Sequence, residues 1–173
     1  KRIQHETGST MVPSSAMDIA ANGDIYIGCS ILVGASFSKK VTYKAVIVDS
    51  ISKYHQPYEA FIACYNKNGE LKWVKRSGGR SIIGSLKATD DGVVIGGTIM
   101  NNLSFFGLKA DTIGNKKMFL ASFSTKGNIK WLKTTTAHSI KALTTDQDQN
   151  IYAIVESKIA YPTVMVFEGD SLR

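Results

Sequence analysis

The sequence contains no run of eighteen apolar residues and no basic start followed by a hydrophobic segment, so nothing in it is expected to span a membrane. It also lacks a Gly-rich phosphate loop and the G-x-S-x-G pattern of serine hydrolases. The three histidines, His5, His55 and His138, have no second histidine or carboxylate at metal-ligand spacing. We therefore expect no metal, no cofactor and no catalytic residue in this chain.

A helical hydrophobic pattern is absent as well, and the chain has an internal repeat instead. Residues 61–75, FIACYNKNGELKWVK, return without a gap as residues 119–133, FLASFSTKGNIKWLK, a shift of 119 − 61 = 58 residues. In both copies side chains alternate with a period of two on either side of a turn that contains Asn and Gly, which predicts a β-hairpin. Trp73 and Trp131 follow the turn glycine at a fixed spacing, so we expect them to be packing anchors.

A second kind of hairpin precedes each of these. Residues 16–30, AMDIAANGDIYIGCS, predict a strand, a turn and a strand, and similar segments follow later in the chain. The shifts between them are 95 − 27 = 68 and 153 − 95 = 58 residues, from the matched positions Ile27, Ile95 and Ala153. The first repeat therefore carries 68 − 58 = 10 extra residues, which must lie between Gly28 and Phe61.

A short block recurs between the two kinds of hairpin. It consists of an Asp, a hydroxyl residue and an aliphatic residue, as Asp49-Ser50-Ile51, Asp111-Thr112-Ile113 and Asp170-Ser171-Leu172. Each repeat is therefore predicted to form a hairpin, a short extended excursion and another hairpin. Four main strands in about 58 residues are more typical of a β-propeller blade than of a sandwich.

These features together resemble a known family. The NGDIYIG segment at residues 22–28, an excursion toward an Asp, and the pattern F-[IL]-A-x-[YF]-x-x-x-G-x-[LI]-K-W-x-K are similar to the SBBP type of β-propeller repeat. That family is named for seven blades and occurs in secreted and surface proteins of Gram-negative bacteria of the Bacteroides group. The resemblance implies a propeller at the cell surface or in the periplasm, and it carries no catalytic residues. The propeller repeats of quinoprotein dehydrogenases and of outer-membrane assembly lipoproteins are a second resemblance, because they also end a blade on Gly-x-x-x-Trp. Their repeat is shorter than the one in this chain.

We accordingly expect an all-β chain of about three four-stranded antiparallel blades. The predicted parts are the end of a preceding blade, a first repeat with the insertion, a second repeat and a truncated third one, at residues 1–15, 16–82, 83–138 and 139–173. Two repeats and a fragment are too few to close a ring of seven or eight blades. Each blade of a propeller is stabilised mainly by its neighbours. The chain is therefore expected to pack against further blades of the same propeller.

The basic residues outnumber the acidic ones, 21 to 14, which gives a formal net charge of +7. The lysines are spread along the chain, and Lys72, Lys75, Lys130 and Lys133 occupy matched positions in the last strand of each repeat. Lysines in such positions protect edge strands from pairing with other molecules. Nucleic-acid binding would favour clustered Arg with stacking aromatic residues, so we do not expect it.

Cysteine is scarce, with only Cys29 and Cys64. They fall on neighbouring predicted strands, so a cross-strand disulfide is conceivable. Their counterparts in the second repeat are Gly97 and Ser122, which shows that neither position requires sulfur. We expect two free thiols.

Residues 146–150, DQDQN, have the acidic spacing of a calcium loop. An EF-hand loop would also need Gly at its sixth position and Glu at its twelfth, where this chain has Ile151 and Ser157. A hairpin turn is the preferred interpretation, with calcium as the alternative.

The ten extra residues of the first repeat are expected in loops at residues 34–40 and 52–59. Tyr54, His55 and Tyr58 would place aromatic rings with polar tips in one exposed connection, a composition enriched at interfaces. They are candidate partner-binding residues. The alternative is a longer loop with no binding role.

The recurring Asp blocks resemble the acceptor pattern for O-glycosylation in Bacteroides-type bacteria. That resemblance makes Ser50, Thr112 and Ser171 candidate glycosylation sites. The alternative is an Asx-type turn that was copied with the repeat.

The function that these features favour is a non-enzymatic scaffold or binding module that presents blade loops to a protein or glycan partner. A subunit or fragment of a propeller enzyme is the competing hypothesis, because propeller active sites collect residues from several blades. An envelope-assembly scaffold of the quinoprotein-like kind is a third.

Overall fold

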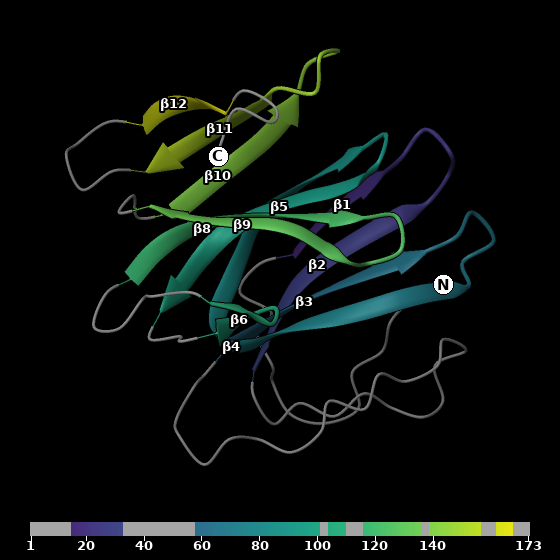
Figure 1. Cartoon of the computed structure of the whole chain (residues 1–173), viewed down its shortest axis with the longest axis horizontal. Coiled ribbons are helices and arrows are strands. Elements are labelled where there is room, and N and C mark those ends of the chain that lie inside the picture. The colour runs from purple at the N-terminus through teal and green to yellow at the C-terminus, as the bar shows by residue number, and fades with distance from the viewer. Residues whose placement is uncertain are drawn as a thin grey trace.

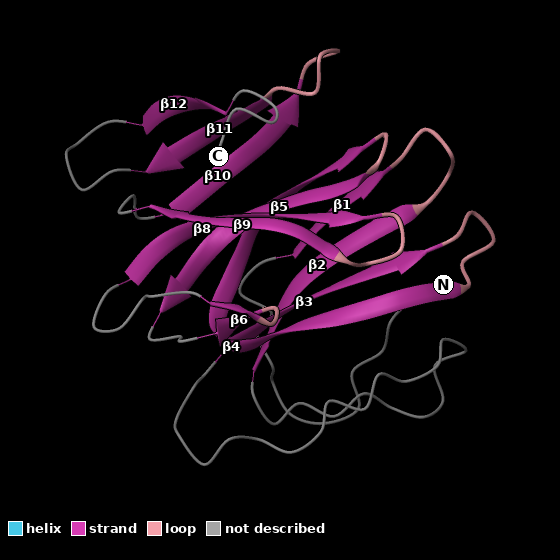
Figure 2. Cartoon of the chain, in the orientation of Figure 1, coloured by secondary structure: helices cyan, strands magenta, loops and turns pink. Residues whose placement is uncertain are grey.

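The computed structural model describes residues 15–32, 58–100, 104–109, 116–135, 139–156 and 162–167 of the 173. These residues form strands and the turns that join them (Figure 2), so the predicted all-β class is confirmed. Among them, no helix is long and apolar enough to cross a membrane. In chain order the strands are β1 (Ser15–Ile19), β2 (Ile25–Leu32), β3 (Tyr58–Tyr65), β4 (Leu71–Thr89), β5 (Gly92–Met100), β6 (Ser104–Phe105), β7 (Leu108–Lys109), β8 (Lys116–Ser124), β9 (Ile129–Thr135), β10 (Ser139–Thr145), β11 (Ile151–Glu156) and β12 (Pro162–Phe167).

The long strand β4, with 19 residues, belongs to two sheets. Its residues up to Arg80 pair with β3, and those from Ser81 pair with β5. We call β1, β2, β3 and this first half of β4 the first sheet, and the second half of β4 with β5, β8 and β9 the second sheet. Strands β10, β11 and β12 make the third sheet (Figure 1). All three are antiparallel, and none of them closes on itself within the described residues.

The two copies of the repeated hairpin have the same register. Ala63 pairs with Val74 in the first copy, and Ala121 pairs with Leu132 in the second. Each ladder then shifts by one residue, directly after Cys64 and Ser122 respectively. The repeated sequence therefore produces the same local structure twice, and the predicted hairpins are confirmed.

Four hairpins turn through the same five-residue loop, at residues 20–24, 66–70, 124–128 and 146–150. In each, the N–H of the first residue donates to the carbonyl of the fifth, and the N–H of the fourth donates to the carbonyl of the first. The fourth residue has a positive φ: 85° at Gly23, 79° at Gly69, 78° at Gly127 and 63° at Gln149. Glycine adopts this conformation without steric cost, which explains the recurring turn glycine. The predicted hairpin turn at residues 146–150 is thus present.

The three sheets contact one another along their first strands. β1 and β10 both pack against the second half of β4. On one side, the N–H of Ala88 donates to the Asp18 carboxylate at 2.9 Å. On the other, the N–H of Leu143 donates to the Ser85 hydroxyl at 3.0 Å. The second sheet therefore lies between the first and the third.

Two glycines allow this close approach, and they occupy equivalent positions in β2 and β5. A Cβ on Gly28 would lie 3.1 Å from the Ile83 side chain, and one on Gly96 would lie 2.4 Å from the Ile140 side chain. A side chain at either position would hold the neighbouring sheet away. The same contact is therefore made twice, from the first sheet to the second and from the second to the third.

We call the contact surface between the first and second sheets the first seam, and that between the second and third sheets the second seam. Strand β5 is buried on both faces, with Val93 and Ile95 in the first seam and Val94 in the second. The first seam buries, among others, the large side chains of Tyr26, Ile62, Ile83, Phe105, Phe119 and Phe123. Those of the second seam are Met118, Leu120, Ile140, Leu143 and Ile151.

A buried polar cluster holds β4 where it passes from the first sheet to the second. The Arg76 guanidinium lies 2.5 Å from the buried Glu59 carboxylate, which also accepts the N–H of Gly78 at 2.9 Å. The hydroxyls of Ser77 and Ser81 lie 2.8 Å apart beside them. These bonds satisfy polar groups that the change of sheet would otherwise leave buried without partners.

The segments that precede the Asp blocks of the second and third repeats differ in structure, whereas the blocks themselves lie outside the described residues. Leu108 lies in β7, which pairs with β6 in a separate two-stranded sheet, whereas Phe167 ends β12, which pairs along β11. The predicted extended excursion of the third repeat is thus a strand of the third sheet, whereas that of the second repeat lies in a separate small sheet. The physical reason is that the edge of β11 offers backbone hydrogen-bonding groups, and Val164-Met165-Val166 is a segment suited to a strand.

Candidate functional site

Most of the candidate binding and glycosylation residues predicted from the sequence lie outside the described residues. These are Tyr54 and His55 of the candidate binding loop and the candidate glycosylation residues Ser50, Thr112 and Ser171. Tyr58 is described as backbone, and it is the first residue of β3, paired with Leu32. The loop expected at residues 52–59 therefore ends before Tyr58, because the β2–β3 ladder continues to that residue. The structure does not bring these candidates together into a described site.

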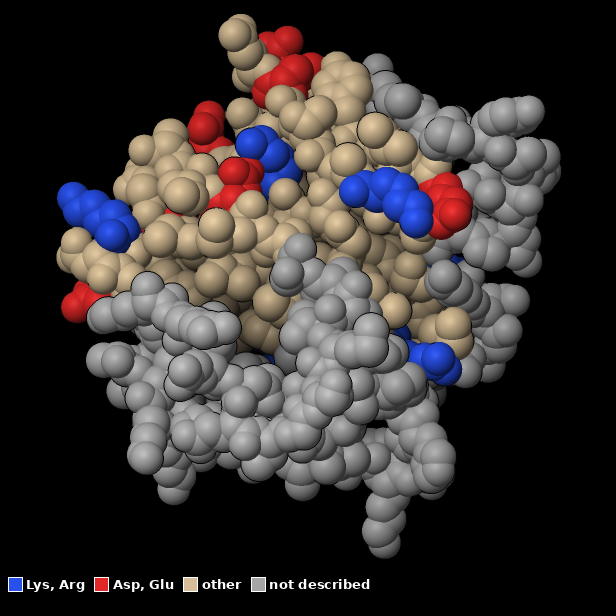
Figure 3. Space-filling model, turned by 180° about the vertical axis from the view of Figure 1, so that it is seen from behind, with Lys and Arg blue, Asp and Glu red and all other residues tan. Residues whose placement is uncertain are grey.

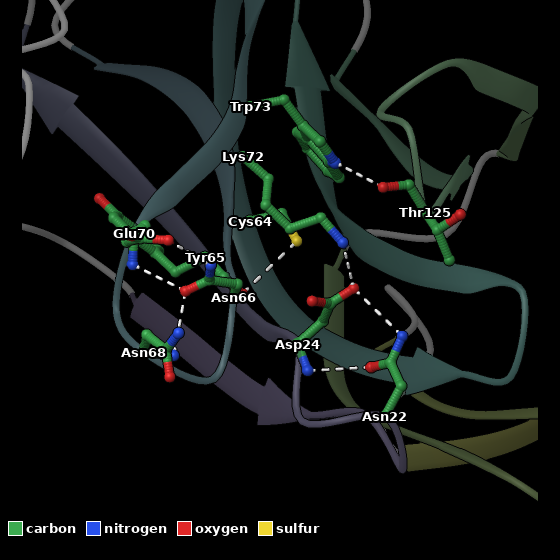
Figure 4. Close-up of polar contacts among 10 residues, drawn as sticks. All are labelled: Asn22, Asp24, Cys64, Tyr65, Asn66, Asn68, Glu70, Lys72, Trp73 and Thr125. Atoms are coloured by element: carbon green, nitrogen blue, oxygen red, sulfur yellow. Dashed lines mark hydrogen bonds and ion pairs between the residues drawn. The ribbon is translucent and has the colours of Figure 1, made fainter.

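The seams place polar and aromatic side chains next to each other, and the first seam shows how they are arranged when the space is filled. Trp73, on the first half of β4, is partly buried against the second sheet. Its ring centroid lies 6.0 Å from that of Tyr26 and 6.3 Å from that of Phe123. Its indole N–H donates to the carbonyl of Thr125 at 2.9 Å (Figure 4). Trp73 therefore joins the first sheet to the second, as expected of a packing anchor.

An ion pair closes the edge of the first seam. The Lys72 ammonium lies 2.6 Å from the carboxylate of Asp24, whose side chain is only 7% exposed. The side-chain amide of Asn22 also donates to Asp24, at 3.2 Å, in the same turn (Figure 4). The hydrogen bond to Asp24 raises the pKa of Lys72. The lysine thus has a structural partner, and does more than protect an edge strand.

The second seam has an equivalent lysine–aspartate ion pair and an equivalent tryptophan. Lys130, 130 − 72 = 58 residues after Lys72, forms an ion pair with Asp91 in the turn between β4 and β5. Trp131 follows it and packs partly buried against the second seam. The hydrogen bond from Lys130 holds the pKa of Asp91 below its usual value. The two seams therefore share their tryptophan and their lysine–aspartate pair.

The second seam is not filled in the same way. It contains a cavity of about 290 Å³, which we call the seam cavity. The wall positions that correspond to Tyr26 and Cys64 of the first seam are Val94 and Ser122, since Tyr26 pairs with Cys64 and Val94 pairs with Ser122. The described residues that line it are Thr89, Asp90, Asp91, Val94, Ser122, Lys130, Trp131, Gln149 and Ile151.

The polar side chains around the seam cavity bond mainly to one another. Asp91 accepts from Lys130 and from the Thr89 hydroxyl, the latter at 3.1 Å. The Gln149 amide donates to Asp90 at 3.5 Å. The Lys133 ammonium lies 5.9 Å from the centroid of the Trp131 ring. The surfaces that remain are the Trp131 ring, the aliphatic walls and the hydroxyl of Ser122.

The two cysteine thiols of the described residues are weak nucleophiles near neutral pH. Cys29 and Cys64 are both free, as predicted. Burial raises the pKa of each thiol to about 11, so both are protonated near neutral pH. The Asp146 carboxylate of the possible calcium loop accepts from Asn150 and from the Tyr152 hydroxyl, at 2.9 and 2.8 Å. Among the described residues, no cluster of three potential metal ligands occurs.

The surface charge is mixed. On the face drawn in Figure 3, Lys and Arg side chains of the described residues lie apart, with acidic side chains between them. Ion pairs account for part of this pattern, such as Lys87 with Asp18 at 2.8 Å and Lys141 with Glu156 at 3.0 Å. The described residues of this face form no continuous basic stripe of the kind that nucleic acids bind.

The seam cavity was not predicted, although the aligned repeats contain its signal. Matching positions 26 and 94 shows an aromatic ring replaced by Val, and matching 64 and 122 shows Cys replaced by Ser. The sequence alone does not show that both positions border one space on the face of Trp131. Neither a protein-family model nor a curated protein sequence matches this chain.

Proposed function

We propose that this chain is a segment of a β-propeller that acts as a non-enzymatic scaffold or binding module. In this proposal it belongs to a cell-surface or periplasmic bacterial protein, and it packs against further blades of the same propeller. It presents its loops to a protein or glycan partner.

The observation that supports the propeller most directly is the order of the first strands. In a propeller the blades are four-stranded antiparallel sheets arranged radially, with one strand of each nearest the axis. Here β1, the second half of β4 and β10 are neighbours, and each begins an antiparallel sheet. The equivalent glycine contacts at Gly28 and Gly96 repeat the packing from one sheet to the next.

The distribution of polar groups favours binding over catalysis. The ion pairs of Lys72 with Asp24, Lys130 with Asp91 and Arg76 with Glu59 fasten strands and turns of the framework. Side chains used in this way have a structural role. Function is then left to the connections between strands, which can vary while the framework stays constant.

Electron microscopy of the native polypeptide, purified from its own cells, tests the architecture. We expect a disc with a central channel and radially arranged blades. A two-layered particle without a channel would contradict the propeller.

A binding experiment tests the role of the loop. The labelled chain is applied to an array of defined glycans and to a library of immobilised peptides, and the double variant Tyr54→Ser/His55→Ser, which leaves Tyr58 of β3 in place, is compared with it. We expect the variant to lose most of its signal while its melting temperature stays the same. The control is Lys67→Ser/Asn68→Ser, which changes two exposed turn residues. An equal loss in the control, or a fall in melting temperature of the loop variant, would show that Tyr54 and His55 are not a binding surface.

A further inference from the structure

We propose that the seam cavity binds an aromatic ring that carries a single hydroxyl group, a ligand of the size of phenol or p-cresol. The first seam supplies the evidence, because its corresponding space is filled by the ring of Tyr26. The proposal does not depend on the number of repeats or on the role of the loops.

The equivalence of the two spaces rests on strand register. Tyr26 of β2 pairs with Cys64 of β3, and Val94 of β5 pairs with Ser122 of β8. In both ladders the next strand brings a tryptophan opposite the second residue of the pair, Trp73 opposite Cys64 and Trp131 opposite Ser122. The cavity therefore lies beside Val94, Ser122 and Trp131, where the first seam has Tyr26, Cys64 and Trp73.

The first seam also shows that such a space accepts a ring and its hydroxyl. The Tyr26 side chain is fully buried, and its ring centroid lies 6.0 Å from that of Trp73. The Tyr26 hydroxyl makes no hydrogen bond of ordinary geometry, and among the described residues the only side chain that interacts with it as a weak partner is the Cys64 thiol. In the second seam, the Ser122 hydroxyl takes the place of the Cys64 thiol, and a hydroxyl is a better hydrogen-bond partner than a thiol. A phenolic ligand would therefore be better satisfied than Tyr26 itself.

The size of the seam cavity is sufficient. Its volume is about 290 Å³. An enclosed, dry protein cavity of about 150 Å³ already binds benzene. The seam cavity is larger but open to solvent on one side, where the Asp91 side chain is 68% exposed. The replacement of Tyr26 by Val94 removes the side chain that would otherwise occupy this volume.

The chemistry of the walls favours an aryl alcohol over a sugar. A pyranose needs several free polar partners, but Thr89, Asp91 and Lys130 already bond to one another. Gln149 and Asp90 form a second bonded pair. The Trp131 ring with Val94 and Ile151 offers an apolar slot, and aromatic rings gain from offset or tilted contact with an indole.

The test uses fluorine NMR of the whole chain labelled with 5-fluorotryptophan, which gives one resonance for Trp73 and one for Trp131. Titration with p-cresol should shift the Trp131 resonance saturably, with a Kd of about 1 mM for a ligand of this size. The Trp73 resonance serves as an internal control and should not move, because Tyr26 fills its seam. Methyl β-D-glucopyranoside at the same concentrations should shift neither resonance.

Two variants sharpen the test. Val94→Tyr should fill the cavity, abolish the p-cresol shift and raise the melting temperature. Ser122→Ala keeps the space and removes the hydroxyl, so it should weaken p-cresol about tenfold while leaving toluene unchanged; this arm remains informative if Val94→Tyr does not fold. The proposal is overturned if p-cresol gives no saturable shift, if both resonances shift equally, if the glucoside binds as tightly as p-cresol, or if folded Val94→Tyr still binds it.

Discussion

At the scale of the residue, Gln149 has a φ of 63° at a turn position where the three equivalent turns have glycine. A residue with a Cβ is strained in this conformation by about 1 kcal/mol. We predict that Gln149→Gly raises the free energy of unfolding by about 1 kcal/mol, measured by urea denaturation. Gln149→Ala is the matched control, since it removes the same side chain but keeps the strain. A similar gain in both variants would mean that the side chain, and not the backbone, is responsible.

Gly127 combines a positive φ with a close neighbour. A Cβ at this position would lie 2.6 Å from the Trp73 ring, while nothing lies within 4 Å of the same position on Gly107, which also has a positive φ. We predict that Gly127→Ala lowers the free energy of unfolding by about 3 kcal/mol, because overpacking adds to backbone strain. Gly107→Ala should lose about 1 kcal/mol, from strain alone. Equal losses in urea denaturation would indicate that Trp73 moves aside without cost.

At the scale of the element, the crossing of β4 depends on an asymmetric ion pair. The Glu59 side chain is 8% exposed, whereas that of Arg76 is 35% exposed and can be hydrated when it loses its partner. We predict that Arg76→Gln lowers the free energy of unfolding by about 3 kcal/mol, because it leaves a carboxylate buried. Glu59→Gln should lose about 1 kcal/mol. The double variant, measured in the same denaturation series, should lose less than the sum of the two. Additive losses would show that the two side chains act independently.

At the scale of the whole molecule, the thiols make folding sensitive to alkaline pH. Burial raises the pKa of Cys29 and Cys64 to about 11, and an unfolded thiol has a pKa near 9. The folded chain therefore keeps two protons that the unfolded chain releases as the pH rises from about 9 to about 11. Stability from this source is complete below pH 9 and is lost through that window.

We predict that the free energy of unfolding falls between pH 9 and pH 11 by about 2 kcal/mol for each thiol. Denaturation at several pH values, with reductant present, measures the fall. The double variant Cys29→Ala/Cys64→Ser should show a clearly smaller loss, because neither new side chain titrates there. Identical pH profiles for the two proteins would assign the loss to other groups.

The outer face of the third sheet differs from the two seams. Ile154 occupies the position of Gly28 and Gly96 in the aligned repeats, and its side chain is 42% exposed. A further blade could not approach this face as closely as the second sheet approaches the first. The proposed propeller would therefore need a wider or differently packed contact beyond the third sheet.

The sequence by itself determined the hairpins, their turns and their order. Alternation with a period of two and a turn glycine are local properties, so Ala63 and Ala121 could be placed on equivalent strands from the repeat alone. The same is true of the free thiols, because the aligned residues Gly97 and Ser122 showed that neither position needs sulfur. Structure adds that Cys64 lies opposite Tyr26 and Cys29 opposite Phe61.

The tertiary structure alone decided which sheets share a strand and what the seams contain. The change of partner inside β4 occurs beside the ion pair of the buried Glu59 with the half-buried Arg76, and β12 pairs along the edge of β11. The seam cavity arises because Val94, Ser122 and Trp131, neighbours on three strands of the second sheet, are faced by Gln149 and Ile151 of the third sheet when the two sheets pack. Such contacts join side chains that are far apart in sequence. A local sequence pattern predicts the strand on which each side chain lies, but it does not predict which strands pack against one another.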